Sequence, residues 1–257
     1  MEQITDMQIA FVTMGPGAAP LDAESLSRAW SRLWPNEEPL ADLQGDRGAL
    51  TFSFMGGGGM LGFMPAPVPW SDLEGPAACA WHWREATEVL RAHEAHLVVG
   101  VMGGDEGPSL ADSIRLTLLI AAVCEASPAT TGVYWGEGTA VSPADRFVEL
   151  AREMAPDDYP LLAWVEFRVF PADEGTRWSV FTTGLRALGF MEIEVRAVKG
   201  DPSDILETVL DIAGYVVHSN AVLKDGDTIG TSAEQKLRIR HVPSEWEREG
   251  PVVWIDM

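Results

Sequence analysis

The sequence has few cysteines, few basic residues and no long apolar run. Its two cysteines, Cys79 and Cys124, lie far apart, and neither belongs to a CxxC pair. A disulfide framework is therefore not expected, and the apolar neighbours of both thiols predict buried, reduced side chains. The longest mainly apolar run, residues 116–124, is too short to cross a bilayer. The first residues lack the basic and apolar regions of a signal peptide, so we expect a cytoplasmic bacterial protein.

The scarcity of basic residues excludes several classes of partner. Eighteen Lys and Arg stand against 39 Asp and Glu, which gives a formal net charge of −21. Such a chain repels phosphate backbones and anionic lipid, so we expect neither nucleic acid nor a membrane as a partner. The acids are spread along the whole chain, which fits either simple solubility or electrostatic steering of a basic protein partner.

No catalytic set and no cofactor motif can be recognised. The run from Gly56 to Gly59 is not followed by the Lys of a phosphate-binding loop, and it opens onto an expected strand. There is no nucleophile elbow, and Cys79 with His82 lies within an expected apolar helix, where burial would raise the pKa of the thiol. We therefore expect no cofactor and no catalytic residues, although an enzyme is not excluded.

Two histidines form the most metal-like pattern, in His93-Glu94-Ala95-His96. Side chains three residues apart on a helix can share a ligand. The pair falls where an expected helix gives way to a strand, and the surrounding sequence offers no further ligand pattern. We keep His93 and His96 as candidate binding residues and expect no metal site.

Alternating charges mark two expected strands of the second half. Glu192, Glu194 and Arg196 share one face of the first strand, and Lys236, Arg238 and Arg240 share one face of the second. If the strands are neighbours, the acids lie opposite the bases as a solvated ladder of ion pairs. If they are not, Glu192 and Glu194 become candidates for binding or for acid–base chemistry.

Tyr134 and Trp135 are further candidate binding residues. They lie in a short expected strand of a chain that has ten tryptophans. Aromatic side chains dominate many protein interfaces, but core packing is their more frequent use.

Apolar periodicity and turn signals predict an α+β fold with mixed or antiparallel sheets covered by helices. The expected order of the first half is β-α-β-β-α-β, which is ferredoxin-like, and that of the second is a related β-β-β-α-β. The expected domains are 1–104 and 105–257, packed as one compact body. The expected strands cover residues 7–14, 49–55, 60–65, 96–102, 132–135, 161–170, 178–183, 190–198 and 236–242. The expected helices cover residues 22–33, 76–94, 110–126, 142–154 and 202–218.

Several motifs, taken together, resemble one bacterial family, that labelled domain of unknown function 4261. The resemblance extends from about Phe11 to Ser244 and is most specific between Thr183 and Arg240. Its motifs are Met64-Pro65-Ala66-Pro67-Val68-Pro69-Trp70, His93-Glu94-Ala95-His96-Leu97-Val98-Val99, Gly132-Val133-Tyr134-Trp135-Gly136, Thr183-Gly184-Leu185, Glu192-Ile193-Glu194-Val195 and Asp225-Gly226-Asp227-Thr228-Ile229-Gly230. The resemblance implies no activity, ligand or catalytic residue.

Acidity, abundant tryptophan and the lack of a catalytic set favour a non-enzymatic binding module. One specific form of this hypothesis is an immunity-like protein that neutralises a basic protein partner. The alternative is an enzyme or small-molecule binder that uses His93, His96, Glu192 and Glu194 in a cleft between the two α+β units. The sequence leaves the oligomeric state open.

Overall fold

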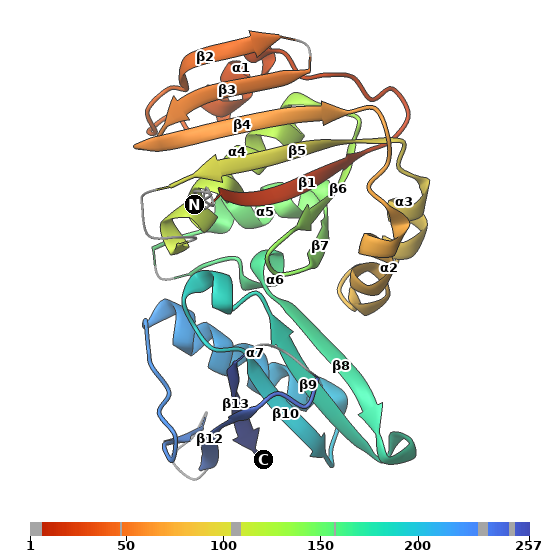
Figure 1. Ribbon diagram of the computed structural model, residues 1–257, viewed down its shortest axis with the longest axis vertical. Coiled ribbons are helices and arrows are strands. Elements are labelled where there is room, and N and C mark those ends of the chain that lie inside the picture. Colours follow the sequence, from red (N-terminus) through yellow and green to blue (C-terminus); the bar gives the residue numbers. More distant parts are fainter. Residues whose placement is uncertain (1–6, 47, 104–108, 157, 231–235, 247–249) are drawn as a thin grey trace, which may run out of the picture. The chain divides into compact units, whose positions relative to one another are not determined.

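The computed structural model describes residues 7–46, 48–103, 109–156, 158–230, 236–246 and 250–257. The chain divides into two compact units, unit 1 (Met1–Met154) and unit 2 (Ala155–Met257). Each unit contains one sheet with helices, so the expected α+β class with antiparallel and mixed sheets is confirmed (Figure 1).

Unit 1 is built on a seven-stranded antiparallel sheet of order β2-β3-β4-β5-β1-β6-β7 (Figure 1). Its strands are β1 (Met7–Met14), β2 (Ala41–Asp46), β3 (Ala49–Phe54), β4 (Gly57–Met64), β5 (Ala95–Met102), β6 (Thr130–Trp135) and β7 (Ala140–Pro143). Three of the four consecutive glycines belong to β4. The expected turn is therefore confined to Met55 and Gly56, both of which have positive φ.

Three helices cover one face of this sheet: α1 (Ala23–Leu33), α4 (Leu110–Ala126) and α5 (Ala144–Glu153). The Asp22 carboxylate accepts a hydrogen bond from the Ser25 N–H at 2.8 Å and so caps α1, as its sequence predicts. Helix α4 is apolar around most of its circumference because it lies between the sheet and the other two helices.

The prediction of a single helix over residues 76–94 is wrong. The chain instead forms α2 (Trp70–Cys79) and α3 (Ala86–Ala92), separated by a break that begins at Ala80. The break lets Trp83 pack between the two helices, in an apolar cluster with Leu73 and Leu90. Burial of that indole outweighs the helical periodicity on which the expectation rested.

The ferredoxin-like topology is not confirmed. In that arrangement the first strand lies between the last two strands of the β-α-β-β-α-β unit. Here β5 lies between β4 and β1. Strand β1 also pairs with β6, which brings residues after 104 into the same sheet. The expected division after residue 104 therefore does not coincide with the boundary between the compact units.

Unit 2 contains a six-stranded mixed sheet of order β11-β12-β13-β10-β9-β8. Its strands are β8 (Glu166–Ala172), β9 (Arg177–Thr183), β10 (Ile193–Val198), β11 (Thr228–Ile229), β12 (Leu237–Pro243) and β13 (Pro251–Asp256). The short helices α6 (Leu161–Trp164), η1 (Asp173–Gly175) and η2 (Arg186–Leu188) connect these elements. Strand β13, which the sequence analysis missed, pairs in parallel with β10 and so separates β10 from β12.

Helix α7 (Pro202–His218) packs on one face of the second sheet. It begins as its sequence predicts, with Asp201 as the N-cap and Pro202 in the first turn. Its buried side chains include Ile205, Val209 and Ile212, which form the core of unit 2 with Val195 and Ile239 of the sheet.

Candidate functional site

His93 is a structural residue of unit 1. The Val68 N–H donates to its Nε2 at 2.8 Å, and its Nδ1–H donates to the Leu90 carbonyl. These contacts fix the neutral tautomer and use both ring nitrogens. The side chain therefore has no nitrogen left for a metal ion or a substrate.

His96 and His82 hold neighbouring backbone in the same way. The Nδ1–H of His96 donates to the Ala66 carbonyl at 2.8 Å, and the Nε2–H of His82 donates to the Val141 carbonyl at 3.0 Å. Burial lowers the pKa of His82 and of His96. Burial therefore favours the neutral form of both rings.

Tyr134 and Trp135 point to opposite faces of the first sheet, as neighbours in a strand must. Trp135 is buried and stacks on Phe147 of α5, with ring centroids 6.4 Å apart. Tyr134 is partly exposed and stacks on Phe11 at 5.8 Å. The alternation thus makes Trp135 a core residue and leaves Tyr134 at the edge of the apolar cluster that contains Trp83 and Leu90, beneath α2 and α3.

Glu192 closes the connection between β9 and β10. Its carboxylate is buried and accepts hydrogen bonds from the Thr182 hydroxyl at 2.6 Å, the Gly184 N–H at 2.9 Å and the Arg186 N–H at 3.2 Å. Gly184 has φ 119°, which a residue with a side chain rarely adopts, and this conformation aims its N–H at the carboxylate. Glu192 is therefore occupied in folding the loop.

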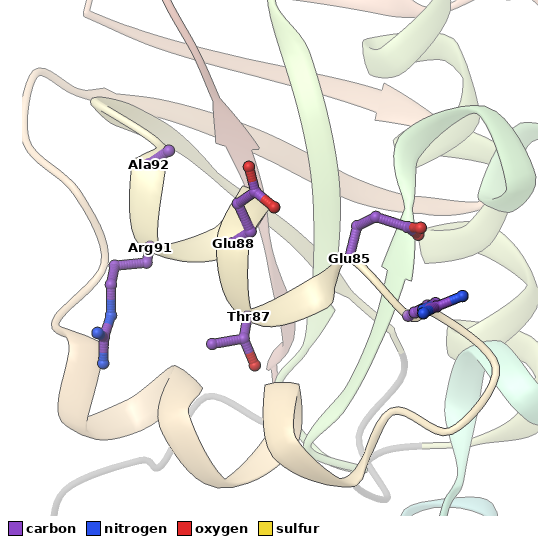
Figure 2. Close-up of a pocket in the computed structure, with 6 residues that line it drawn as sticks. Glu85, Thr87, Glu88, Arg91 and Ala92 are labelled. Carbon is purple, nitrogen blue, oxygen red and sulfur yellow. The ribbon is translucent and has the colours of Figure 1, made fainter.

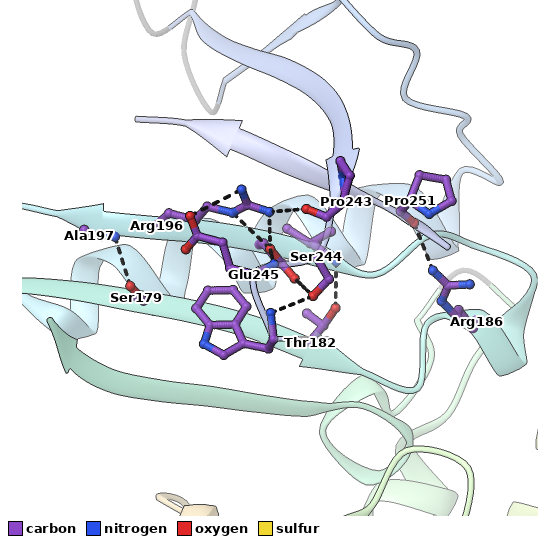
Figure 3. Close-up of polar contacts among 12 residues, drawn as sticks. Ser179, Thr182, Arg186, Arg196, Ala197, Pro243, Ser244, Glu245 and Pro251 are labelled. Carbon is purple, nitrogen blue, oxygen red and sulfur yellow. Dashed lines mark hydrogen bonds and ion pairs between the residues drawn. The ribbon is translucent and has the colours of Figure 1, made fainter. Parts of the chain in front are cut away.

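Glu194 is fully buried and lies on the opposite face of the second sheet from its strand neighbour Val195. Figure 3 shows its partners Arg196 and Ser244. Arg196 donates to its Oε2 from Nε at 3.0 Å and from Nη2 at 2.6 Å. The Ser244 hydroxyl donates to its Oε1. Arg196 also donates to the Pro243 carbonyl at 2.8 Å, so the pair fastens the chain after β12 to the sheet.

The two strands with alternating charges are not neighbours, so no ladder of ion pairs joins them. Because β13 lies between β10 and β12, Trp254 is the cross-strand neighbour of both Glu194 and Arg240. The Arg240 guanidinium lies 5.7 Å from the Trp254 ring and that of Arg196 lies 5.5 Å from it. Acid and base thus share a face, as alternation predicts, but an indole separates them.

The sequence-predicted site residues are divided between the two units. His93, His96, Tyr134 and Trp135 lie in unit 1, and Glu192 and Glu194 lie in unit 2. Both acids and both histidines are engaged in hydrogen bonds to neighbouring protein atoms. Within the described residues no group of three or more side chains is placed to hold a metal ion. No described helix is both long and apolar enough to cross a membrane.

The two thiols differ in environment. Neither forms a disulfide. Cys124 is buried as its sequence predicts, and burial raises the pKa of its thiol to about 12. Cys79 is only half buried, so the expectation of two buried thiols holds for one of them.

A shallow hollow of about 670 Å³ lies over α3 in unit 1 (Figure 2). Its lining side chains are Arg84, Glu85, Thr87, Glu88, Arg91 and Ala92. The Arg91 guanidinium covers the Trp70 ring at 4.5 Å. Four of its six lining residues are charged, so the hollow has the character of an ordinary solvated helix surface.

A groove of different character runs along α7 in unit 2, with a volume of about 670 Å³. We call it the α7 groove, and its lining residues are Asp211, Ile212, Tyr215, Ala221, Val222, Leu223, Asp227, Thr228, Ile229 and Gly230. Tyr215 is 52% exposed and Val222 is 75% exposed. A second cavity of about 110 Å³ adjoins residues 221–223 and reaches Val216 and Val253 of the core.

Polar contacts shape the rim of the α7 groove. The Asp227 carboxylate accepts from the Lys224 N–H at 2.9 Å, and the Asp225 carboxylate accepts from the His241 N–H at 2.8 Å. His241 also donates from Nε2 to the Leu223 carbonyl at 2.8 Å, which anchors the apolar wall. The sequence analysis noted this turn as a motif but missed the groove, because apolar residues after a helix give no periodic signal.

The comparisons with known proteins bear on this same part of the chain. No curated protein and no solved structure matches the chain. The model of one family matches residues 181–255, which contain β10, α7, the α7 groove, β12 and most of β13. This match confirms the resemblance noted from the motifs between Thr183 and Arg240. The matching model is that of the family described as Domain of unknown function (DUF4261), and the match covers residues 181–255 of this chain.

Proposed function

We propose that this protein is a non-enzymatic binding module that holds a basic protein partner in the α7 groove. The observation that carries the proposal is the composition of the groove. Apolar side chains form its wall and floor, and the carboxylates of Asp211 and Asp227 lie at the same opening as an exposed tyrosine ring. The groove also lies inside the segment that the family model matches.

This composition suits a lysine or arginine side chain. Such a side chain has an apolar stem and a cationic head. In the groove the stem would lie against Ile212, Val222 and Leu223, and the head would lie near Asp211 and Asp227. Tyr215 follows Asp211 by four residues on α7, so its ring faces the same opening and offers a cation–π contact.

The charge of the whole chain supports the same class of partner. A net charge of −21 attracts basic proteins over distances comparable with the Debye length and raises their association rate. An immunity-like role follows from this proposal, in which the protein neutralises a basic partner by occupying its surface in the cytoplasm.

The alternative, an enzyme that uses His93, His96, Glu192 and Glu194, has weaker support. Hydrogen bonds to Val68, Leu90 and Ala66 engage the histidines. Hydrogen bonds from the β9–β10 loop and the ion pair with Arg196 engage the two acids. Chemistry at these residues would first have to break contacts that hold the fold.

The test measures binding of a labelled peptide of alternating leucine and arginine by fluorescence anisotropy. The double variant Asp211→Asn with Asp227→Asn should weaken binding about tenfold. Each exposed carboxylate contributes up to about 1 kcal/mol, and 1.4 kcal/mol corresponds to a factor of ten. Tyr215→Ala should weaken binding through loss of the ring.

The matched control is Glu85→Gln with Glu88→Gln, which removes the same charge from the hollow over α3. It should reduce affinity only by the small effect of net charge. Equal losses in the two double variants would mean that attraction is non-specific, and the proposed groove would be wrong.

A further inference from the structure

The outward face of the first sheet carries no charge over its central strands. Cross-strand pairing places Met102 beside Met7 and Gly58, Gly100 beside Ile9 and Met60, and Val98 beside Phe11 and Gly62. We call these nine residues the open face. In a chain where 57 of 257 residues are charged, a charge-free area of this extent is unusual for a solvated sheet surface.

The helices leave the open face uncovered. Helices α1, α4 and α5 pack on the opposite face, where Val12, Leu97 and Val99 are buried (Figure 1). Helices α2 and α3 cover only the side of β6 and β7, through the apolar cluster that borders Phe11 and Tyr134. Met102 is 41% exposed, and its neighbours Met7, Ile9, Met60 and Val98 are partly exposed.

Methionines make this surface adaptable. The space that a Cβ on Gly100 would enter is occupied by Met7 Sδ, 2.9 Å from that position, and by Met60 Cγ, 3.0 Å from it. These two unbranched side chains therefore lie across the glycine and fill the trough between β1 and β4. Methionine adopts many rotamers at little cost, so the side chains can move apart for a ligand.

We propose that the open face binds the apolar side of an amphipathic helix that carries basic residues on its flanks and belongs to a protein partner. This inference concerns unit 1 and does not depend on the α7 groove. Three neighbouring strands place their outer members about 10 Å apart, which matches the diameter of a helix. The strands have eight residues each, about 27 Å, the length of about 18 helical residues.

Charge identifies the flanks of that helix. Unit 1 contains 21 Asp and Glu against eight Lys and Arg, and Asp46 of β2 lies in the same cross-strand row as Ala49, Gly62 and Val98. An apolar helix with lysines beside it would therefore meet complementary charge at the margin. A second copy of this chain would bring two bodies of net charge −21 together, which opposes self-association through this face.

The experiment uses the full chain with 13C-labelled methionine methyl groups and an 18-residue helical peptide of leucine and lysine. We expect the methyl signals of Met7, Met60 and Met102 to shift on addition of the peptide, and that of Met191 in unit 2 to stay. The same peptide with glutamate in place of lysine should bind at least tenfold more weakly. Met60→Lys should reduce affinity for the lysine peptide at least tenfold. Met102→Lys should reduce this affinity equally, and because Met102 is more exposed, the substitution should not destabilise the fold.

In the groove variant Asp211→Asn with Asp227→Asn, the lysine peptide should still shift the methyl signals of Met7, Met60 and Met102 as it does in the wild type, which separates this inference from the proposed function. The inference is overturned if the peptide does not bind, if only Met191 shifts, or if the glutamate peptide binds equally well. A wild-type dimer in light scattering that Met102→Lys converts to a monomer would also overturn it, because the occupant would then be a second copy.

Discussion

At the scale of the residue, the acidic and histidine side chains that stand out in the sequence serve the fold. Glu194 is the clearest case, since its carboxylate has no exposed surface and contacts Arg196 and Ser244. A buried ion pair contributes little net stability compared with apolar residues of the same volume. Removing one partner, however, leaves the other charge without compensation in the protein interior.

We therefore expect Glu194→Gln to lower the free energy of unfolding by about 3 kcal/mol. Urea denaturation followed by tryptophan fluorescence measures this change. The control is Glu24→Gln on α1, whose pair with Arg28 is largely exposed and should contribute less than about 1 kcal/mol. If the two variants lose similar amounts of unfolding free energy, the buried Glu194–Arg196 pair contributes no more to stability than an exposed pair does.

At the scale of the element, three histidines fasten the α2–α3 segment to the first sheet. His96 on β5 binds the Ala66 carbonyl, His82 between the helices binds the Val141 carbonyl of β7, and His93 joins the end of α3 to Val68. The metal-like spacing of His93 and His96 thus results from a helix end and a strand start that both contact residues 66–68. His93 accepts at its unprotonated Nε2, whereas His82 and His96 donate an N–H, and it is burial that disfavours the charged forms of these two rings.

Acidification should loosen this segment. Burial lowers the pKa of His82 and of His96 below the 6.5 of an exposed histidine. Between the folded-state pKa and the unfolded-state pKa of each histidine, the unfolded chain binds more protons than the folded chain. The contribution of the histidines to the free energy of unfolding is therefore complete above about pH 6.5 and decreases as the pH falls below this value. Unfolding measured by urea from pH 8 to pH 5 should show this decline.

The double variant His82→Gln with His96→Gln keeps an N–H donor at each position and removes the titration. Its decline between pH 7 and pH 5 should be shallower than that of the wild type. Measurement at pH 8, where the histidines are neutral in both states, reports the packing cost separately. An unchanged slope would mean that other groups cause the decline.

At the scale of the whole molecule, both units carry the same excess of acid. Unit 1 has 21 Asp and Glu against eight Lys and Arg, and unit 2 has 18 against ten. The ion pairs that the structure describes are mostly exposed and short-range, and they leave a surplus of carboxylates. Mutual repulsion of that surplus opposes the compact state of either unit.

Salt should therefore stabilise the protein. Raising sodium chloride from about 20 mM to about 200 mM shortens the Debye length to less than 10 Å and should raise the thermal midpoint by a few degrees. Calorimetry at pH 7 measures the shift, and a neutral osmolyte at equal osmolality serves as the control. A midpoint that falls with salt would mean that attractive pairs, rather than repulsion, dominate the surface electrostatics.

Elements with local signals could be predicted from the sequence. Asp22 and Asp201 predicted the starts of α1 and α7, because an N-cap residue is next to the helix that it caps. The apolar composition of residues 110–126 predicted α4, because a helix that is buried on most sides is apolar along its whole length. The motifs between Thr183 and Arg240 predicted the resemblance to the family whose model matches residues 181–255. The class of fold followed from the order of these elements.

The order of the strands and the roles of the prominent side chains depend on contacts between distant parts of the chain. Strand β5 lies between β4 and β1, and β13 lies between β10 and β12, because distant pairing and not chain order sets the neighbours in a sheet. That insertion separates Glu194 from Arg240 by the Trp254 ring. The same long-range packing buries the histidines against backbone carbonyls, opens the α7 groove and leaves the open face uncovered, and none of these contacts joins residues that are adjacent in sequence.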